Sequence, residues 1–376
     1  MQTRSLHLLD SYLPRTETFI WQALRKLRRF PPLVAAERRE NGDAFPLPSA
    51  EFVALEARRD LWPRLRARVL GDFAPATYPG AAEALRDRAV VCHVHKGHHA
   101  LATRSLTRSL DLPLIVNFYG SDVSQREFLR RARRGYDDLF ARARFLLVEG
   151  PAMRERLIGI GAPAERIRVQ RIAVDAAEYP FRERVWDGVR PVRLLFVGRM
   201  VEKKGLETAL RALAIVEGGF DWRLTVIGDG PLGARMRTLA ATLGLAGRVD
   251  FVGARSLAET RAALASHDLL LQPSRTSPDG DGEGGAPTVI LEAQACGLPV
   301  VTTDHDDIPH VTVPGASAWI SPQGDVEALA ESLRRAARES ARWGEMGRAG
   351  RAKVELDHDA TRVVAALEDL YAEAAV

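Results

Sequence analysis

The sequence predicts an α/β protein made of two doubly wound, Rossmann-like domains that face each other across a cleft. Apolar runs typical of buried parallel strands alternate with amphipathic helical segments from Ser5 to about Asp175, and the same alternation restarts at Val192. A polar, proline-bounded stretch at residues 178–191 separates the two series. Because each series can form its own layered sheet, we expect two domains of one kind.

The first series opens with a strand at residues 5–13, followed by a turn and an amphipathic helix that Thr16 or Thr18 can cap. The apolar residues at helical spacing are Phe19, Ile20, Ala23, Leu24 and Leu27. A helical region interrupted by prolines is expected at residues 45–85. The other strands expected in this half lie at residues 31–41, 89–94, 112–118, 144–150 and 167–175.

The second series alternates more regularly. Its strands are expected at residues 192–198, 222–228, 249–253, 268–274 and 299–304. Its helices are expected at residues 206–216, 233–244, 257–267, 324–338 and 366–376. The resulting division is an N-terminal domain at 1–183, a linker at 184–191, a C-terminal domain at 192–357 and a final helical segment, 358–376, that can pack back on the first domain.

The composition is ordinary for a soluble globular protein, with 46% hydrophobic and 27% charged residues. No apolar run approaches the roughly 18 residues needed to span a membrane. The N-terminus lacks the features of a secretory signal, and two cysteines make neither a disulfide framework nor a zinc set. We therefore expect a cytoplasmic protein.

The net charge of +4 is unevenly distributed, with a basic excess in the first half and an acidic excess in the second. Basic clusters at residues 25–30, 58–68 and 130–134 lie on helix-like stretches. They form either a solvated arginine-rich face or a surface for an anionic membrane or an acidic acceptor. Aromatic residues are not interleaved with these charges, which argues against nucleic acid.

The stretch from Ser274 to Val301 joins a polar, glycine-rich loop to a short apolar helix between two expected strands. It therefore lies at the carboxyl edge of a parallel sheet, where open α/β sheets bind ligands. Pro287 suits the first helical turn, whose free N–H groups favour an anion such as phosphate. Glu292 has apolar neighbours and needs a hydroxyl-rich ligand or a buried partner. The alternative is a solvated acidic loop before a capped helix.

Two glycine-containing turns follow neighbouring strands of the second series. Residues 198–205, GRMVEKKG, place Arg199 and Lys204 at the entry to a helix, where two cations can neutralise a diphosphate without a metal. Exposed basic residues at a strand end are the alternative. Residues 228–231, Gly-Asp-Gly-Pro, are ordinary turn chemistry and contribute shape.

Metal sites are not expected. The histidines at positions 93, 95, 98 and 99 follow one strand, but no acidic ligand stands at a characteristic spacing. A hydrogen-bonding or proton-shuttling histidine at a cleft edge is the preferred interpretation. Asp279 and Asp281 have the Asp-x-Asp look of a divalent-metal site, yet we expect them to face solvent or the rim of the site.

Taken together, these motifs resemble a known family. GRMVEKKGLETAL, VIGDGP and EGGAPTVILEAQACGLPVV, in this order, resemble the C-terminal half of the retaining, family 4 type of glycosyltransferase with the GT-B fold. YLPRTETFI, HVHKG and FYGSDVS are similar to the branch that contains colanic-acid-type exopolysaccharide transferases. The resemblance implies retaining transfer of a sugar from a nucleotide-diphosphate sugar to a glycan or lipid-linked acceptor, with no cofactor and no required metal.

The resemblance also implies roles for individual residues. Arg199 and Lys204 match the basic pair that holds the diphosphate. Glu283 matches the glutamate that contacts the donor sugar, and Glu292 matches the one that binds the ribose. Catalytic roles are implied for Arg199, Lys204, Glu283 and His95. Further donor contacts are implied at Gly228, Gly284, Gly285, Ala286 and Thr288, and acceptor or cleft contacts at Thr16, Glu17, Thr18, His93, Tyr119, Gly120 and Asp122.

Three departures from the family pattern are present. Glu283 and Glu292 enclose eight residues where the family has seven, and Tyr119 stands where many relatives have histidine. Residues 173–175 read Ala-Val-Asp in place of Gly-Val-Asp. Two alternatives therefore stay open, a nucleotide-sugar epimerase on the same architecture and a non-catalytic protein that binds a nucleotide sugar or a membrane. For the transferase, we expect a peripheral place at the inner face of the membrane because the first half is basic.

Overall fold

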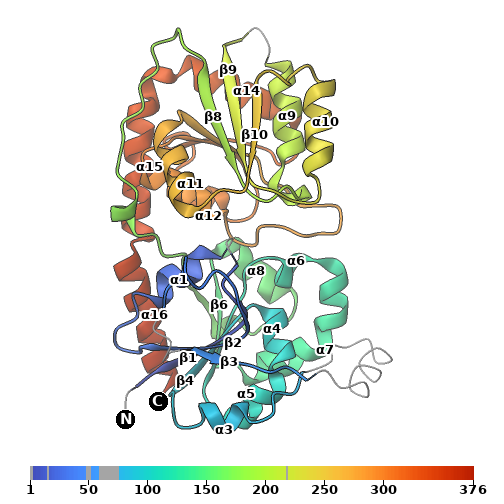
Figure 1. Ribbon diagram of the computed structural model, residues 1–376, viewed down its shortest axis with the longest axis vertical. Helices are drawn as coiled ribbons and strands as arrows, with labels where there is room; N and C mark the ends of the chain where they lie inside the picture. The colour runs from blue at the N-terminus through green and yellow to red at the C-terminus, as the bar shows by residue number, and fades with distance from the viewer. Residues whose placement is uncertain (1–2, 15–16, 48–51, 59–75, 217–218) are drawn as a thin grey trace. The chain divides into compact units, whose positions relative to one another are not determined.

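The computed structural model describes residues 3–14, 17–47, 52–58, 76–216 and 219–376. They form two compact units, Met1–Ala173 with Ala360–Val376, and Val174–Asp359. Each unit contains one parallel sheet covered by helices (Figure 1). The predicted fold class of two Rossmann-like α/β units is confirmed.

The first unit has a seven-stranded sheet of order β3-β2-β1-β4-β5-β6-β7. Its strands are β1 (Ser5–Tyr12), β2 (Pro32–Arg39), β3 (Phe52–Ala54), β4 (Val91–His95), β5 (Leu114–Asn117), β6 (Phe145–Val148) and β7 (Ile167–Val169). The central strands are buried throughout, as expected for a parallel sheet with helices on both faces. In the register of this sheet, His7 of β1 lies opposite His93 of β4.

The helices of the first unit are α1 (Thr18–Leu24), α3 (Ala81–Leu85), α4 (Gly97–Ala102), α5 (Arg104–Leu110), α6 (Ser121–Ser124), α7 (Arg126–Arg142), α8 (Pro151–Gly159) and α16 (Ala360–Ala374). One core joins the sheet to α4, α5, α7 and α8. A second core joins it to α1 and α16, through Ile20 and Tyr371. The residue alternation along each strand divides the apolar side chains between these two cores.

Two local predictions for this unit differ from the structure. Glu17 occupies the N-cap of α1 and no side chain caps it, so the cap predicted for Thr18 is wrong, while Thr16 lies outside the described residues. Residues 52–54 were expected to be helical but form β3, because they pair in parallel with β2 at the sheet edge. Most of the basic cluster at residues 58–68 also lies outside the described residues.

The last helix, α16, is part of the first unit and is held there by a carboxylate. Glu368 is 5% exposed, and its Oε1 accepts backbone N–H groups of Arg28 at 2.7 Å, Arg29 at 2.6 Å and Phe30 at 3.1 Å. These three N–H groups lie beyond the end of α1 at Leu24 and are therefore outside its hydrogen-bond ladder, so they need another acceptor. Charge-assisted bonds of this kind tie the C-terminal helix to the segment between α1 and β2.

The second unit has a six-stranded parallel sheet of order β10-β9-β8-β11-β12-β13. Its strands are β8 (Val192–Val197), β9 (Trp222–Ile227), β10 (Val249–Gly253), β11 (Leu269–Gln272), β12 (Val300–Thr303) and β13 (Ala318–Ser321). Its α-helices are α9 (Leu206–Ile215), α10 (Gly233–Thr242), α11 (Leu257–Ser266), α12 (Thr288–Ala295), α13 (Ile308–Val311), α14 (Val326–Arg338) and α15 (Trp343–Asp357). The predicted strands of this half all form, and β13, α13 and α15 are additional.

The second unit begins at Val174, earlier than the boundary expected at residue 183. The N–H of Arg182 donates to the carbonyl of Cys296 at 3.1 Å, and Arg190 pairs with the buried Asp268 at 2.6 Å. These bonds fasten the polar stretch at 178–191 to the second unit. A segment that has the composition of a linker is therefore part of this unit's surface.

Replacing Glu368 by alanine is expected to lower the free energy of unfolding of the first unit by about 2–4 kcal/mol. The change removes three charge-assisted hydrogen bonds and leaves the buried N–H of Phe30 without this partner. Asp369→Ala is the matched control, since its side chain is 70% exposed and pairs only with the exposed Arg29. Urea unfolding of both variants measures the difference, and equal losses would contradict this role of Glu368.

Candidate functional site

The loop after β11 contains a buried ion pair between Glu283 and Lys204. Glu283 Oε2 lies 2.8 Å from Lys204 Nζ, and Glu283 Oε1 accepts the hydroxyl of Ser274 at 2.9 Å. The two charged side chains are 7% and 16% exposed. Lys204 comes from the turn after β8, so the pair joins the ends of two neighbouring strands.

The environment of Glu283 keeps its carboxyl ionised. Burial by itself raises the pKa of this carboxyl, but the charges of Lys204 and Lys203 and the hydrogen bonds from Lys204 and Ser274 outweigh it and leave the pKa below its ordinary value. Lys203 also contacts Asp281 at 3.2 Å and donates to the carbonyl of Gly282 at 2.8 Å. Sequence reasoning assigned no role to Lys203, although two adjacent lysines were the available signal.

The backbone of the same loop is held by two residues that follow β12. The N–H of Glu283 donates to His305 Nε2 at 3.1 Å, and the N–H of Gly284 donates to Asp306 Oδ2 at 2.8 Å. Asp306 has a φ of 49°, which is uncommon for a residue other than glycine. His305 and Asp306 were not among the predicted residues. Gly284, for which the resemblance implies a donor contact, therefore has its N–H bonded to Asp306.

Close backbone approaches explain two of the glycines at this sheet edge. A Cβ on Gly228 would lie 2.0 Å from the carbonyl oxygen of Gly198, and one on Gly205 would lie 1.8 Å from that of Pro273. Gly228 and Gly205 also have φ values of 133° and 72°. The turns after β8, β9 and β11 therefore pack against one another through backbone atoms. Gly228 shapes these turns, and the donor contact implied for it stays a prediction.

Glu292 lies in α12 and has a protein partner. Its Oε1 accepts the hydroxyl of Tyr179 at 2.8 Å. Arg261 pairs with Glu178 and places its guanidinium 4.9 Å from the centre of the Tyr179 ring. Burial raises the pKa of Glu292, and the Tyr179 hydrogen bond and the Arg261 charge oppose that rise only in part. Tyr179 and Arg261 were missed because they lie far from Glu292 in sequence.

Arg199 is the exposed cation of the predicted basic pair. Its side chain makes no hydrogen bond or ion pair with any residue that the structure describes. Gly285 and Ala286 are buried in the loop, Pro287 is the N-cap of α12, and Thr288 is its first residue and half-buried. Asp279 accepts the hydroxyl of Ser277 and the N–H of Asp281, so it stabilises its own loop. The exposed Arg199 side chain is therefore available to bind an anion.

The first unit contains a pocket at the carboxyl ends of its central strands. Its polar wall includes His93, His95, Asn117 and Tyr119, and its apolar wall comes from α1, α16 and residues 172–173. The Tyr119 hydroxyl lies 2.7 Å from His95 Nδ1. The predicted residues His93, His95 and Tyr119 are thus brought together.

Other predicted residues of this unit have different surroundings. Asp122 is 2% exposed and accepts the N–H groups of Gly97 at 2.8 Å, Gly120 at 2.9 Å and Tyr119 at 3.1 Å. Its carboxylate therefore closes the turn, and the acceptor or cleft contact implied for it stays a prediction. Gly120 has a φ of 142° and permits this turn. Thr18 is half-buried at the start of α1.

Glu17 belongs to an ion cluster that sequence reasoning did not find. Lys96 Nζ lies 2.5 Å from Glu17 Oε1 and 3.1 Å from Asp10 Oδ1. Lys96 follows β4 with a φ of 77°, a conformation unusual for lysine. Burial raises the pKa of Glu17, whereas the hydrogen bonds of Asp10 with His98 and Lys96 and the Lys96 charge hold the pKa of Asp10 below its ordinary value despite burial. The cluster marks the carboxyl edge of β1 and β4.

Comparison with protein families matches both units. Residues 19–173 match the family described as glycosyl transferase 4-like domain, and residues 191–339 match glycosyl transferases group 1. The two matches together cover most of the chain. The chain belongs to the family 4-like, group 1 glycosyltransferases. The resemblance inferred from the motifs is confirmed.

Named relatives of this glycosyltransferase act in exopolysaccharide synthesis. The amylovoran biosynthesis glycosyltransferase AmsK of Erwinia amylovora is 37% identical over 65% of this chain and 60% of its own length. The putative colanic acid biosynthesis glycosyltransferase WcaL of Escherichia coli is 37% identical over 57% of this chain and 53% of its own. The chain thus spans little more than half the length of the curated relatives it matches.

Solved structures show that the glycosyltransferase has the GT-B fold. The Anabaena protein Alr3699/HepE, crystallised with UDP and glucose, has a TM-score of 0.79 and 16% identity and covers 99% of this chain and 100% of its own. WaaG, a glycosyltransferase involved in lipopolysaccharide biosynthesis, has a TM-score of 0.67 and 17% identity over 98% of this chain and 99% of its own. Among the described residues, none of the helices has the length and apolar character to cross a membrane.

Lys204→Ala is expected to lower the free energy of unfolding of the second unit by about 3 kcal/mol, because Glu283 then stays buried without its nearest cation. Adding Glu283→Gln should recover most of the loss, since the uncompensated charge is gone. The matched control is Lys353→Ala, which removes an i,i+4 pair with Asp357 within α15 at 2.7 Å, in which each side chain is 22% exposed, and should cost under about 1 kcal/mol. Urea unfolding measures all three, and equal losses for the two lysines would contradict the pairing argument.

The Glu292→Gln variant is expected to be at least as stable as the wild type at pH 8. At pH 5 its free energy of unfolding should be lower relative to that of the wild type than at pH 8. Burial raises the folded-state pKa of Glu292, so its contribution to stability is present below the unfolded pKa and is lost as pH rises through the folded pKa. A glutamine has no proton to lose and can still accept from Tyr179. Urea unfolding at both pH values tests the sign, and a variant destabilised equally at both would contradict it.

Proposed function

We propose that this protein is a retaining transferase that moves a sugar from a nucleotide-diphosphate sugar to a glycan or lipid-linked acceptor in exopolysaccharide synthesis. The second unit binds the donor. The observation that carries this proposal is the juxtaposition, at one sheet edge, of the buried Lys204–Glu283 pair with the glycine turns and the exposed Arg199. The names of relatives such as AmsK and WcaL support the biosynthetic setting.

The diphosphate is the part of the donor that gains charge as the sugar leaves. Arg199 supplies a cation with no protein partner among the described residues, and Lys204 supplies a second one near the end of β8. The first turn of α12 adds N–H groups and the positive end of a helix dipole. Such groups stabilise the transition state more than the ground state because the charge develops there. No metal or cofactor enters this proposal.

The two glutamates bind hydroxyl groups of the donor in this proposal. Glu283 is ionised and oriented by Lys204 and Ser274, so its carboxylate accepts hydrogen bonds from the transferred sugar. Glu292 accepts from the ribose, in exchange for or in addition to its bond from Tyr179. Gly285, Ala286 and Thr288, which lie between the two glutamates in sequence, add donor contacts in this proposal. Because the donor carbohydrate replaces water around these carboxylates, each hydroxyl contact adds specificity.

The acceptor is assigned to the first unit. Its pocket presents His95, Tyr119 and Asn117 beside apolar side chains, a lining suited to a sugar with an apolar face. Glu17, paired with Lys96 at the nearby strand ends, offers a carboxylate for hydroxyls. His95 is the candidate for a contact near the reacting sugar.

The first test of this proposal is whether the protein binds a nucleotide-diphosphate sugar. We expect one nucleotide-diphosphate sugar in a panel of UDP- and GDP-sugars to bind, and Arg199→Ala to weaken that binding roughly 10- to 100-fold through loss of a charge-assisted contact of about 1.5–3 kcal/mol. Arg338→Ala is the matched control, since Arg338 is exposed on α14 and pairs with Glu331. Calorimetry measures both.

Turnover separates the remaining alternatives. A transferase consumes the bound donor in the presence of acceptor glycolipid extract, an epimerase changes the donor sugar without acceptor, and a binding protein does neither. Binding without turnover under any acceptor would contradict the proposed transfer. Donor conversion without acceptor would replace it by epimerisation.

A second proposal places the protein at the cytoplasmic face of an anionic membrane. Helix α7 presents exposed Arg126, Arg130, Arg131, Arg133 and Arg134. Its acidic residues are Glu127 in the first turn, which pairs with Arg130, and Asp137 and Asp138 in its second half. Arginines near an anionic surface contribute about 1 kcal/mol each at physiological salt. The opposite face of α7 packs into the core through Tyr136 and Leu139, so the charged face is held outward.

Vesicle sedimentation tests this membrane contact. Binding is expected to vesicles with anionic phosphatidylglycerol and not to neutral phosphatidylcholine vesicles, and to fall as salt rises. Changing Arg130, Arg131, Arg133 and Arg134 to glutamine should abolish it. The same change at Arg334, Arg335 and Arg338 of α14, where glutamates pair with the arginines, should have little effect. Equal loss in both variants would contradict a role of α7.

A further inference from the structure

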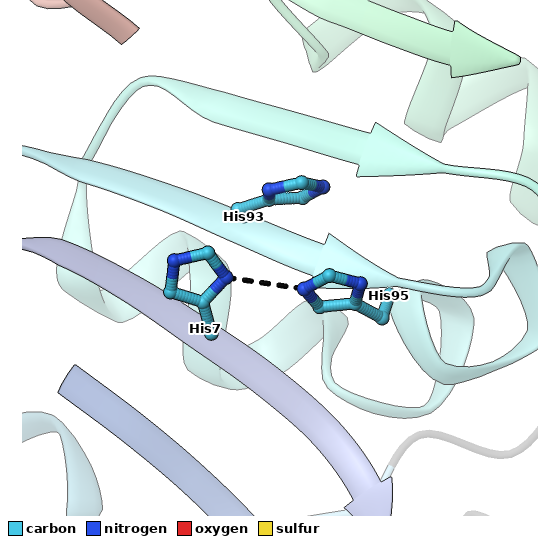
Figure 2. Close-up of side chains that lie close together, drawn as sticks. All are labelled: His7, His93 and His95. Carbon is cyan, nitrogen blue, oxygen red and sulfur yellow. Dashed lines mark hydrogen bonds between the residues drawn. The ribbon is translucent and has the colours of Figure 1, made fainter. Parts of the chain in front are cut away.

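Three buried histidines meet at the centre of the first sheet. His7 comes from β1, and His93 and His95 come from β4, on the face of the sheet that packs against α1 and α16. They are 1%, 1% and 5% exposed. One nitrogen of each ring lies within 4.8 Å of the others (Figure 2). Among the described residues, this is the one group with the spacing of a metal-binding set.

Each ring is held on its outer side by a hydroxyl group. His7 Nε2 lies 2.9 Å from the Ser5 hydroxyl, His93 Nδ1 lies 2.6 Å from the Tyr371 hydroxyl, and His95 Nδ1 lies 2.7 Å from the Tyr119 hydroxyl. Metal-binding histidines usually have their second ring nitrogen hydrogen-bonded in this way, which sets the tautomer and the ring orientation. The hydroxyls leave the other three nitrogens for one another.

The tautomer of His7 follows from its partner. The Ser5 hydroxyl donates its only hydrogen to the carbonyl of Phe30 at 2.9 Å, so it must accept from His7. His7 Nε2 therefore carries the hydrogen, and the lone pair of Nδ1 points at His95 Nε2, 3.1 Å away (Figure 2). One ligand lone pair is thus already directed inward.

His93 provides the second observation. Its Nε2 is buried and has no hydrogen-bond partner among the described residues. A buried imidazole nitrogen without a partner is unfavourable unless another group binds it.

We propose that His7, His93 and His95 bind one divalent transition-metal ion, with zinc as the ion that best suits three imidazoles. Zinc–nitrogen bonds of about 2.0–2.1 Å in a tetrahedral site place ligand nitrogens about 3.3 Å apart. His7 Nδ1 and His95 Nε2, at 3.1 Å, are close to that spacing. On binding, His95 shifts its hydrogen to Nδ1, which then donates to Tyr119.

The third ligand and the fourth position follow from the same geometry. The His93 ring stacks on that of His95 with centres 4.3 Å apart, so His93 must turn to bring its nitrogen in from up to 4.8 Å. Its bond to Tyr371 on α16 limits how far it turns. His93 and His95 also line the pocket, which gives the ion an entry path and leaves its fourth position for water.

This site is separate from the proposed donor site and does not depend on the transfer reaction. The sequence grouped His93 and His95 with His98 and His99 and gave no ligand set. In the structure the third histidine of the group is His7, not His98 or His99, because β1 pairs with β4 and its register places His7 opposite His93. An ion here would join β1, β4 and, through Tyr371, α16, and would hold Tyr119 on the pocket wall.

Cobalt(II) is the probe, because its visible absorption reports coordination by nitrogen in a tetrahedral site. The full chain, stripped with chelator, is expected to bind one Co²⁺ with such absorption, and added Zn²⁺ should displace it. Thermal unfolding of the wild type should shift upward with Zn²⁺, since an ion that binds only the folded state stabilises it. His310→Ala, at an exposed histidine of the second unit, should leave all of this unchanged.

Two variants separate the site from adventitious binding. His93→Ala should weaken Co²⁺ binding by more than about 100-fold, and Tyr371→Phe, which keeps the ring and removes only the hydroxyl bond, should weaken it roughly 10- to 100-fold. Circular dichroism shows whether each variant is folded. If His93→Ala does not fold, the Co²⁺ affinity of Tyr371→Phe tests the site. Absence of the tetrahedral spectrum in the wild type, or equal affinity in wild type and Tyr371→Phe, would overturn the proposal and leave a hydrogen-bonded histidine cluster.

Discussion

The buried pair of Lys204 and Glu283 is the interaction on which the candidate donor site depends. Glu283 is ionised only because Lys204, Lys203 and Ser274 offset the effect of burial. The pair also closes the glycine-rich loop against the turn after β8, and the bonds from His305 and Asp306 hold the loop backbone from the opposite side. A charge that must be neutralised thus determines where the loop lies, and with it the place of α12 and Glu292.

Both units use the same property of parallel sheets. Turns that follow neighbouring strands meet at one edge, so side chains far apart in sequence become neighbours. In the second unit this brings Lys204, Gly228 and Glu283 together, and in the first it brings Lys96 to Asp10 and Glu17. The first unit adds a buried histidine group beneath its edge, where the imidazoles lie among apolar side chains and remain neutral. The two edges therefore offer different chemistry, cationic in the second unit and carboxylate- and imidazole-rich in the first.

Much of the fold could be predicted from the sequence because strands buried in a parallel sheet consist of continuous runs of apolar residues. All described strands except β3 and β13 lie where the runs predict them. The short edge strand β3 could not be predicted, since three residues carry too little pattern and pairing with β2 decides their conformation. Residues 178–191 look like a linker by composition, yet arginine–aspartate and backbone bonds hold them on the second unit.

The sequence by itself determined the family, the two-unit architecture and the positions of Arg199, Lys204, Glu283 and Glu292, because these residues stand in motifs that local spacing defines. Only the tertiary structure decided their partners. It paired Glu283 with Lys204, gave Glu292 the hydroxyl of Tyr179, committed Asp122 to backbone groups, and brought His7 to His93 and His95. The reason is physical: burial makes each polar group require a partner, and which groups are near enough is set by strand order and register, which no local stretch of sequence contains.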